Sequence, residues 1–141
     1  MSGGDFLDSN VLVYLMDEVD LRKYEIARAI VEDSRQDYLT ISFQVVGETL
    51  NVLTRKLIPP FSEDEARSFL SITLMPIWRI FPSQELYSRA LAVQARYQYT
   101  FYDALIIGAA LEADCDRLLS EDMQHGQRIE GLTIVNPFLE S

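Results

Sequence analysis

The sequence predicts an α/β fold in which a central, mostly parallel sheet of about five strands lies between two layers of helices. Short apolar runs alternate along the chain with longer amphipathic stretches, and this alternation is typical of a parallel sheet covered on both faces. The 141 residues fit one domain, residues 1–141. Because 48% of the residues are hydrophobic and 24% charged, the composition favours a globular protein over a disordered chain.

Five short apolar runs have the length and the flanking residues of buried strands. The first lies between two aspartates, and the last stops at Asn136-Pro137. The strands are expected at residues 6–7, 38–41, 77–81, 117–119 and 132–135.

Amphipathic helices are expected between these strands. The clearest follows the second strand, where apolar residues repeat every three or four positions from Phe43 to Leu57. A capping box at Ser62–Glu65 predicts the start of the next helix. Three further helices are expected at about residues 21–34 after Asp20, from Ser83 to about Tyr97, and from Thr100 through a run of small and apolar residues, which should be buried.

The charge of the chain is strongly acidic, with a formal net charge of −10 and a pI of about 4.4. This argues against binding nucleic acid through a basic surface. The objection weakens if many of the carboxylates gather around a divalent metal ion, since the ion reverses the local charge.

Other features bear on the compartment. No stretch reaches the roughly 18 apolar residues that a membrane span needs, and the N-terminus does not have the pattern of a signal peptide. The single cysteine, Cys115, fits a reducing compartment and is expected to be a structural residue in a turn rather than a catalytic thiol. We therefore expect a cytoplasmic protein that does not act at a membrane.

Three acidic residues lie where the carboxyl ends of predicted strands should meet. Asp8 comes just after the first strand, Glu48 lies in the second turn of the helix after the second, and Asp122 lies three residues past the fourth. Ligands of doubly wound sheets bind at this edge. Asp103 stands at the start of a helix, and we assume that this helix begins at the same edge.

Four converging carboxylates repel one another, and a divalent cation removes that repulsion. Oxygen ligands without nearby His or Cys favour Mg²⁺ or Mn²⁺ over Zn²⁺. Such ions can activate water for the hydrolysis of a phosphodiester bond. Asp8, Glu48, Asp103 and Asp122 are therefore the candidate metal-binding and catalytic residues.

Each of these acids also has an ordinary structural interpretation. Asp8 could cap a helix that begins near Asn10, and Asp103 could complete a capping box with Thr100. Glu48 could be a solvated helix residue, and Asp122 a turn residue. The joint placement of the four at one edge favours a site.

The neighbouring polar residues have expected roles in this site. Asn10 and Ser120 should hydrogen-bond the carboxylates, and Glu121 could add a ligand. Arg55 could contact phosphates of a nucleic acid. Glu112, Asp114 and Asp116 follow the end of a helix and are expected at the opposite edge.

The residues around these acids resemble the motifs of PIN-domain nucleases, in the same order and over nearly the whole chain. In that family an apolar strand is followed by Asp-(Thr/Ser)-Asn, as in Phe6–Asn10 here, and the later motifs supply a Glu and two Asp ligands. The corresponding segments are residues 6–14, 42–51, 101–106, 118–126 and 131–138.

The size of the chain resembles most the VapC toxins among PIN domains. This resemblance implies an endoribonuclease that cuts RNA such as tRNA or rRNA with Mg²⁺ or Mn²⁺. It also implies a homodimer and a cognate VapB-like antitoxin that blocks the site. By the same analogy, residues 11–30 would help to form the antitoxin groove, with apolar contacts from Leu21, Tyr24, Ala27 and Ile30, although these four could equally be core residues.

Three alternatives remain open at this point. The chain could be a housekeeping RNA-processing nuclease of the same fold, or an inactive module that binds protein. A phosphoacceptor receiver domain also has an acidic pocket in an α/β fold, but it needs a lysine late in the chain, and the last lysine here is Lys56.

Overall fold

The computed structural model describes residues 3–33 and 38–139 and contains a six-stranded sheet in the order β3-β2-β1-β4-β6-β5. All neighbouring strands are parallel except β5 and β6, which are antiparallel. The strands are β1 (Asp5–Leu7), β2 (Leu39–Ser42), β3 (Trp78–Ile80), β4 (Arg117–Leu119), β5 (Arg128–Ile129) and β6 (Leu132–Val135).

The sheet confirms the predicted fold class and adds one strand to the expected number. The extra strand, β5, has only two residues and pairs with β6 through a tight turn in which Glu130 has φ +55°. A two-residue strand is too short to show an alternating hydrophobic pattern, so the sequence gives no signal for it.

The helices after Ser62, Ser83 and Thr100 begin where these predicted capping residues place them, and Ser42 is a cap that was not predicted. Ser42, Ser62, Ser83 and Thr100 each accept a hydrogen bond from a backbone N–H in the first turn of the following helix. Ser62 and Glu65 form the complete capping box. The helices are α1 (Ser9–Tyr14), α2 (Leu21–Asp33), α3 (Phe43–Arg55), α4 (Glu63–Phe69), α5 (Gln84–Tyr97) and α6 (Phe101–Glu112), with the short turns η2 (Leu70–Leu74) and η3 (Met75–Ile77) before β3.

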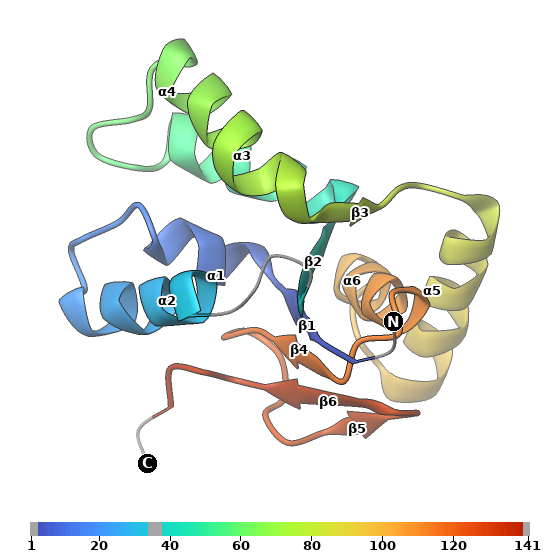
Figure 1. The fold of residues 1–141 in the computed structure, drawn as a ribbon. Coiled ribbons are helices and arrows are strands. Elements are labelled where there is room, and N and C mark those ends of the chain that lie inside the picture. The colour runs from blue at the N-terminus through green and yellow to red at the C-terminus, as the bar shows by residue number, and fades with distance from the viewer. Residues whose placement is uncertain (1–2, 34–37, 140–141) are drawn as a thin grey trace.

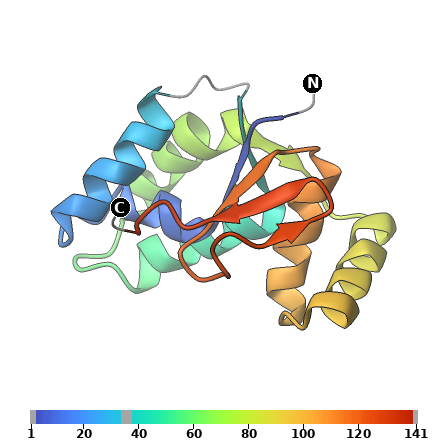
Figure 2. The same ribbon diagram turned by 90° about the horizontal axis from the view of Figure 1, so that it is seen from below.

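The helices form layers on both sides of the sheet. α1 and α2 lie on one side of the strands and the α5–α6 hairpin on the other, while α3 and α4 lie toward the β3 end (Figure 1). The view from below shows the β5–β6 hairpin in front (Figure 2). None of the helices in the described part of the chain has both the length and the apolar composition of a membrane span.

The core is built largely around α6, as its sequence predicts. Residues 104–110 are all buried. A Cβ added at Gly108 would lie 3.5 Å from a side-chain carbon of Leu86 and 3.6 Å from the backbone of Ala90, both in α5. These are ordinary van der Waals distances, so α5 and α6 are already in close contact at Gly108.

Candidate active site

The carboxyl ends of β1 and β4 place Asp8 and Ser120 side by side. Leu7 and Leu119 are partners in the parallel ladder, and the Asp8 N–H donates to the Leu119 carbonyl at 3.0 Å. Immediately beyond this pair, the Ser120 hydroxyl donates to Oδ2 of Asp8 at 2.7 Å. Oδ1 of Asp8 accepts from the Ser9 N–H at 2.7 Å. Asp8 therefore caps α1 and still belongs to the edge of the sheet.

One pocket of about 280 Å³ contains all four of the predicted acids. Asp8 and Asp122 come from the two central strands, and Glu48 comes from the second turn of α3. α6 begins at this same edge, as assumed, and brings in Asp103. The residues that line the pocket are Asp8, Ser9, Glu48, Asn51, Val52, Lys56, Asp103, Ile106 and Asp122.

Short polar side chains orient two of these carboxylates. Asn10 donates from Nδ2 to Oδ2 of Asp122 at 3.2 Å, and the Ser120 hydroxyl accepts from the Asp122 N–H at 3.2 Å. Glu48 accepts from Ser9 Oγ at 3.4 Å and from Gln44 Nε2 at 3.1 Å. The structure thus gives Asn10 and Ser120 the contacts expected from the sequence.

The charges of neighbouring acids contribute to the shifted pKa of Asp8 and of Asp103. The pKa of Asp8 is raised to about 6, chiefly by burial and to a smaller extent by the charges of Glu48 and Asp122, against the hydrogen bonds from Ser120 and Ser9 that lower it. Burial also raises the pKa of Asp103, opposed by its hydrogen bond with Thr100 and assisted by the charge of Asp122. A cation in the pocket would favour the ionised form of each.

The donor set fits a hard divalent cation. The acidic groups offer only oxygen ligands, which Mg²⁺ and Mn²⁺ prefer. Within residues 3–33 and 38–139, no three His, Cys, Asp or Glu side chains stand close enough as a group to hold an ion by themselves. Mg²⁺ typically takes one or two carboxylates and keeps several waters, so separated carboxylates around a polar pocket suit it.

A family model described as the PIN domain matches residues 6–128, most of the chain. The chain belongs to the PIN domain family. The match includes every residue of the pocket.

Solved structures with the same fold include two toxin–antitoxin complexes and one isolated toxin. A complex from Klebsiella pneumoniae has a TM-score of 0.70 at 19% identity, covering 95% of this chain and 98% of the other. VapBC2 from Rickettsia felis, bound to a promoter DNA fragment, has a TM-score of 0.61 at 18% identity and coverage of 92% and 96%.

The isolated toxin is Mycobacterium tuberculosis VapC20, described as cleaving the sarcin–ricin loop. Its TM-score is 0.64 at 20% identity, covering 82% of this chain and 87% of the other. A comparison with curated proteins finds no match.

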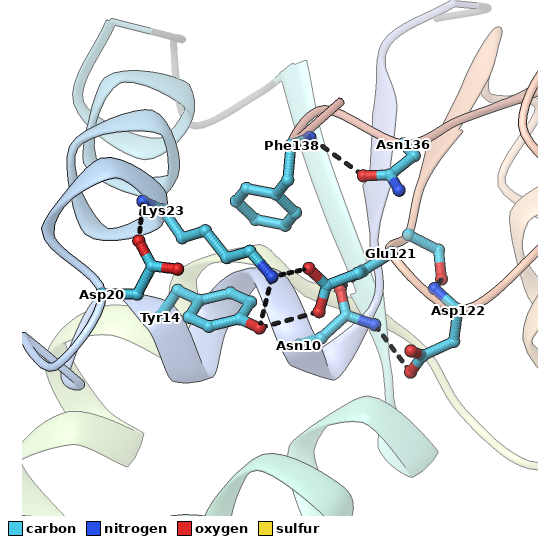
Figure 3. A network of polar contacts seen from close by, with 9 residues as sticks. Asn10, Tyr14, Asp20, Lys23, Glu121, Asp122, Asn136 and Phe138 are labelled. Carbon is cyan, nitrogen blue, oxygen red and sulfur yellow. Dashed lines mark hydrogen bonds and ion pairs between the residues drawn. The ribbon is translucent and has the colours of Figure 1, made fainter. Parts of the chain in front are cut away.

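Two residues expected at the site of this PIN domain lie outside its pocket. Arg55 is exposed and is not among the lining residues, whereas its neighbour Lys56 is. Glu121 points instead toward Tyr14 and Lys23, which both bond its carboxylate (Figure 3). Helical spacing from Glu48 favours Arg55, whereas Lys56 is the C-cap residue beyond α3, so helical periodicity carries no signal for Lys56.

The opposite edge of the PIN domain holds the acids expected there. Asp114 and Asp116 border a separate hollow of about 200 Å³ beside Cys115. The Cys115 side chain is buried, and this burial raises the pKa of its thiol to about 11. A buried thiol that stays protonated is a poor nucleophile, which agrees with the structural role expected for Cys115.

Helix α2 decides between the two interpretations that the sequence left open for Ala27. Ala27 is completely buried and belongs to the core. Leu21 is 64% exposed, and Tyr24 and Ile30 are partly buried. Asp20 accepts from the Lys23 N–H at 3.1 Å and so caps α2, as predicted. The predicted end of α2 at Ser34 falls outside the described residues.

Proposed function

We propose that this PIN domain is a divalent-metal-dependent endoribonuclease of the VapC toxin type that hydrolyses phosphodiester bonds in tRNA or rRNA. The observation that carries the proposal is the convergence of Asp8, Glu48, Asp103 and Asp122 on one pocket. The fold shared with structures described as toxins, one of them as cleaving ribosomal RNA, supports the toxin assignment.

The four carboxylates that line the pocket are the residues that would hold Mg²⁺ or Mn²⁺, one or two of them directly and the others through waters of the ion. A bound ion of this kind supplies a polarised scissile phosphate and a water of lowered pKa. Asn10 and Ser120 hold the carboxylates of Asp122 and Asp8 in fixed directions, which prepares them for the ion. Burial of Asp8 and the charges around it make the empty pocket unfavourable and its loaded form favourable.

Lys56 is the proposed contact to an RNA phosphate. It is the only basic side chain among the described residues that line the pocket. Because the chain carries a net charge of −10, a polyanion needs local positive charge to approach the acids. Lys56 and the bound ion together supply it, and Arg55 is left as a more distant surface charge.

The proposed partners are a VapB-like antitoxin and a second copy of this chain. Exposed apolar side chains support an antitoxin contact: Val19 is 91% and Leu21 64% exposed beside α2. In the loop before α4, Ile58 is 92% exposed, and Val19 and Ile58 both line a hollow of about 380 Å³. Apolar side chains of this extent are typical of a surface covered by a partner.

The decisive test is cleavage of a labelled pool of tRNA and rRNA by the purified, antitoxin-free protein. We expect discrete fragments with Mg²⁺ or Mn²⁺, none with EDTA, and none with Asp8→Asn. Asp116→Asn is the matched control, since it removes an exposed carboxylate at the opposite edge and should cleave normally. Equal cleavage by Asp8→Asn and wild type would overturn the proposed site.

A further inference from the structure

The carboxylate of Glu121, directly before Asp122, is held by two side chains from other parts of the chain. Tyr14, at the end of α1, donates its hydroxyl proton to Oε1 at 2.7 Å. Lys23, in the first turn of α2, forms an ion pair with Oε2 and donates to the Tyr14 hydroxyl at 3.2 Å. Figure 3 shows these three groups pointing toward one another. We call this set the Lys23 anchor.

The aromatic rings of Tyr14 and Phe138 lie beside the Lys23 ammonium and limit its contact with solvent. The Lys23 ammonium lies 5.0 Å from the centroid of the Tyr14 ring and 5.9 Å from that of Phe138, within the range of cation–π attraction. The two rings contact each other edge to face at 5.0 Å. The side chains of Lys23 and Glu121 are only 26% and 23% exposed. A pair so shielded is screened less than a surface ion pair.

The anchor acts on the segment that presents Asp122. The Glu121 N–H donates to Oδ1 of Asn10 at 3.2 Å, while Nδ2 of the same Asn10 donates to Asp122. Ser120 is tied to Asp8. The three successive residues after β4 are thus held by Asp8 and Asn10, and Lys23 adds a contact from α2 to the second of them.

We propose that Lys23 is a positioning residue, which fixes the direction of the Asp122 carboxylate by holding Glu121 and so sets the metal affinity of the pocket. The proposal rests on the proposed function for its metal. It also makes Glu121 a fixed support rather than a ligand. Displacing a carboxylate ligand by loosening its neighbours typically lowers metal affinity about 10- to 100-fold.

A structural ion pair that merely attaches α2 to the fold is the competing explanation. Arg28 provides the matched control. It lies on the same helix, pairs with Glu32 at 2.9 Å and is not part of the Lys23 anchor. Lys23→Met removes the anchor's charge and keeps much of its apolar length. Lys23→Arg retains a cation that can pair with Glu121.

The first measurement is amide hydrogen exchange by NMR in the metal-free protein. Lys23→Met should speed exchange at the backbone amides of Glu121 and Asp122 more than in the rest of the sheet, and Arg28→Met should not. Lys23→Arg should restore protection. Unchanged exchange at those two amides, or an increase spread evenly over the whole chain, would contradict the proposal.

The second measurement is Mn²⁺ affinity, followed by electron paramagnetic resonance. Lys23→Met should weaken binding about tenfold or more, with Arg28→Met unchanged. Glu121→Ala should have a similar effect, and the double variant should be no worse than either, since both remove one anchor. If Glu121 were a ligand, Glu121→Ala alone would weaken binding and Lys23→Met would not. A wild-type protein that binds no Mn²⁺ would refute the proposed function, and the exchange data would still decide the anchor.

Discussion

The hydroxyl of Ser120 donates to the carboxylate of Asp8 across neighbouring strands at 2.7 Å, and Ser120 is completely buried. Ser120→Ala removes this bond and leaves the Asp122 N–H without its acceptor. We expect unfolding free energy to fall by about 1–3 kcal/mol and the pKa of Asp8 to rise further. Metal affinity should fall about 10-fold or more. Urea unfolding and Mn²⁺ binding measure both effects.

Ser42→Ala is the control for this variant. Ser42 is also buried, and its hydroxyl caps α3 through the Val45 N–H without contacting Asp8. It should lose stability and keep its metal affinity. Equal loss of metal affinity in both variants would mean that Ser120 acts only through stability.

Asp8→Asn and Asp5→Asn each neutralise a buried aspartate near β1. They should change the free energy of unfolding in opposite directions. Asp8→Asn can keep both hydrogen bonds, since an amide can accept from Ser9 and donate to Ser120, and it removes a charge that burial disfavours. The metal-free protein should gain about 1–3 kcal/mol at pH 7, the order of the shift of its pKa to about 6. Thermal unfolding in EDTA measures it.

Asp5→Asn should instead destabilise the protein. Asp5 is buried at the start of β1 and accepts from Arg117 at 2.8 and 2.7 Å. Removing the charge weakens a bidentate pair, with an expected loss of about 1–3 kcal/mol. If both substitutions lowered the free energy of unfolding, the ionised carboxylate of Asp8 would not be destabilising the folded protein.

The pH dependence of the metal-free protein follows from the raised pKa of Asp8. Between its ordinary value of 3.8 and about 6, the folded state binds more protons than the unfolded state. The contribution of Asp8 to stability is therefore present at low pH and lost as the pH rises through about 6. Urea unfolding at a series of pH values should show this slope in wild type and a shallower one in Asp8→Asn.

Metal binding should show the opposite dependence on pH. An ion needs Asp8 ionised, so binding displaces its proton below about pH 6 and is insensitive to it above about pH 7. Mn²⁺ affinity should fall about tenfold per pH unit below that point. A flat profile between pH 5 and 7 would exclude Asp8 as a ligand.

Lys56 and Arg55 form a matched pair of neighbouring cations, of which only the first lines the pocket. Lys56→Met should raise KM for RNA and reduce the slope of log affinity against log salt by about one unit. Arg55→Met should change either quantity little, and Lys56→Arg should retain most of the affinity. RNA binding to the Asp8→Asn background at several salt concentrations separates these outcomes.

Much of the fold could be predicted from the sequence because local patterns determine it. Buried runs bounded by acids or prolines mark five of the strands, and the caps at Ser62, Ser83 and Thr100 mark helix starts to the residue. The positions of Asp8 and Asp122 at one edge follow from the parallel order of the sheet. These features depend on residues near one another in sequence.

The remainder depends on contacts between distant segments. Glu121 and Asp122 are neighbours with the same chemistry, and only the packing of α2 directs one toward Lys23 and the other toward the pocket. Arg55 is the last residue of α3 and Lys56 its C-cap, and only the turn out of the helix directs Lys56 into the pocket. An alanine such as Ala27 is found both in cores and at partner-facing positions. Only the orientation of α2 in the folded protein decides between them.

The pairing of β1 with β4 also governs when the site can exist during synthesis. Asp8 precedes its partner Ser120 and the Asp122 carboxylate by 112 and 114 positions. Helices α1 to α6 can form on the ribosome before the residues after β4 complete the pocket. Under the proposed function, a nascent chain could cleave RNA only after β4 pairs with β1.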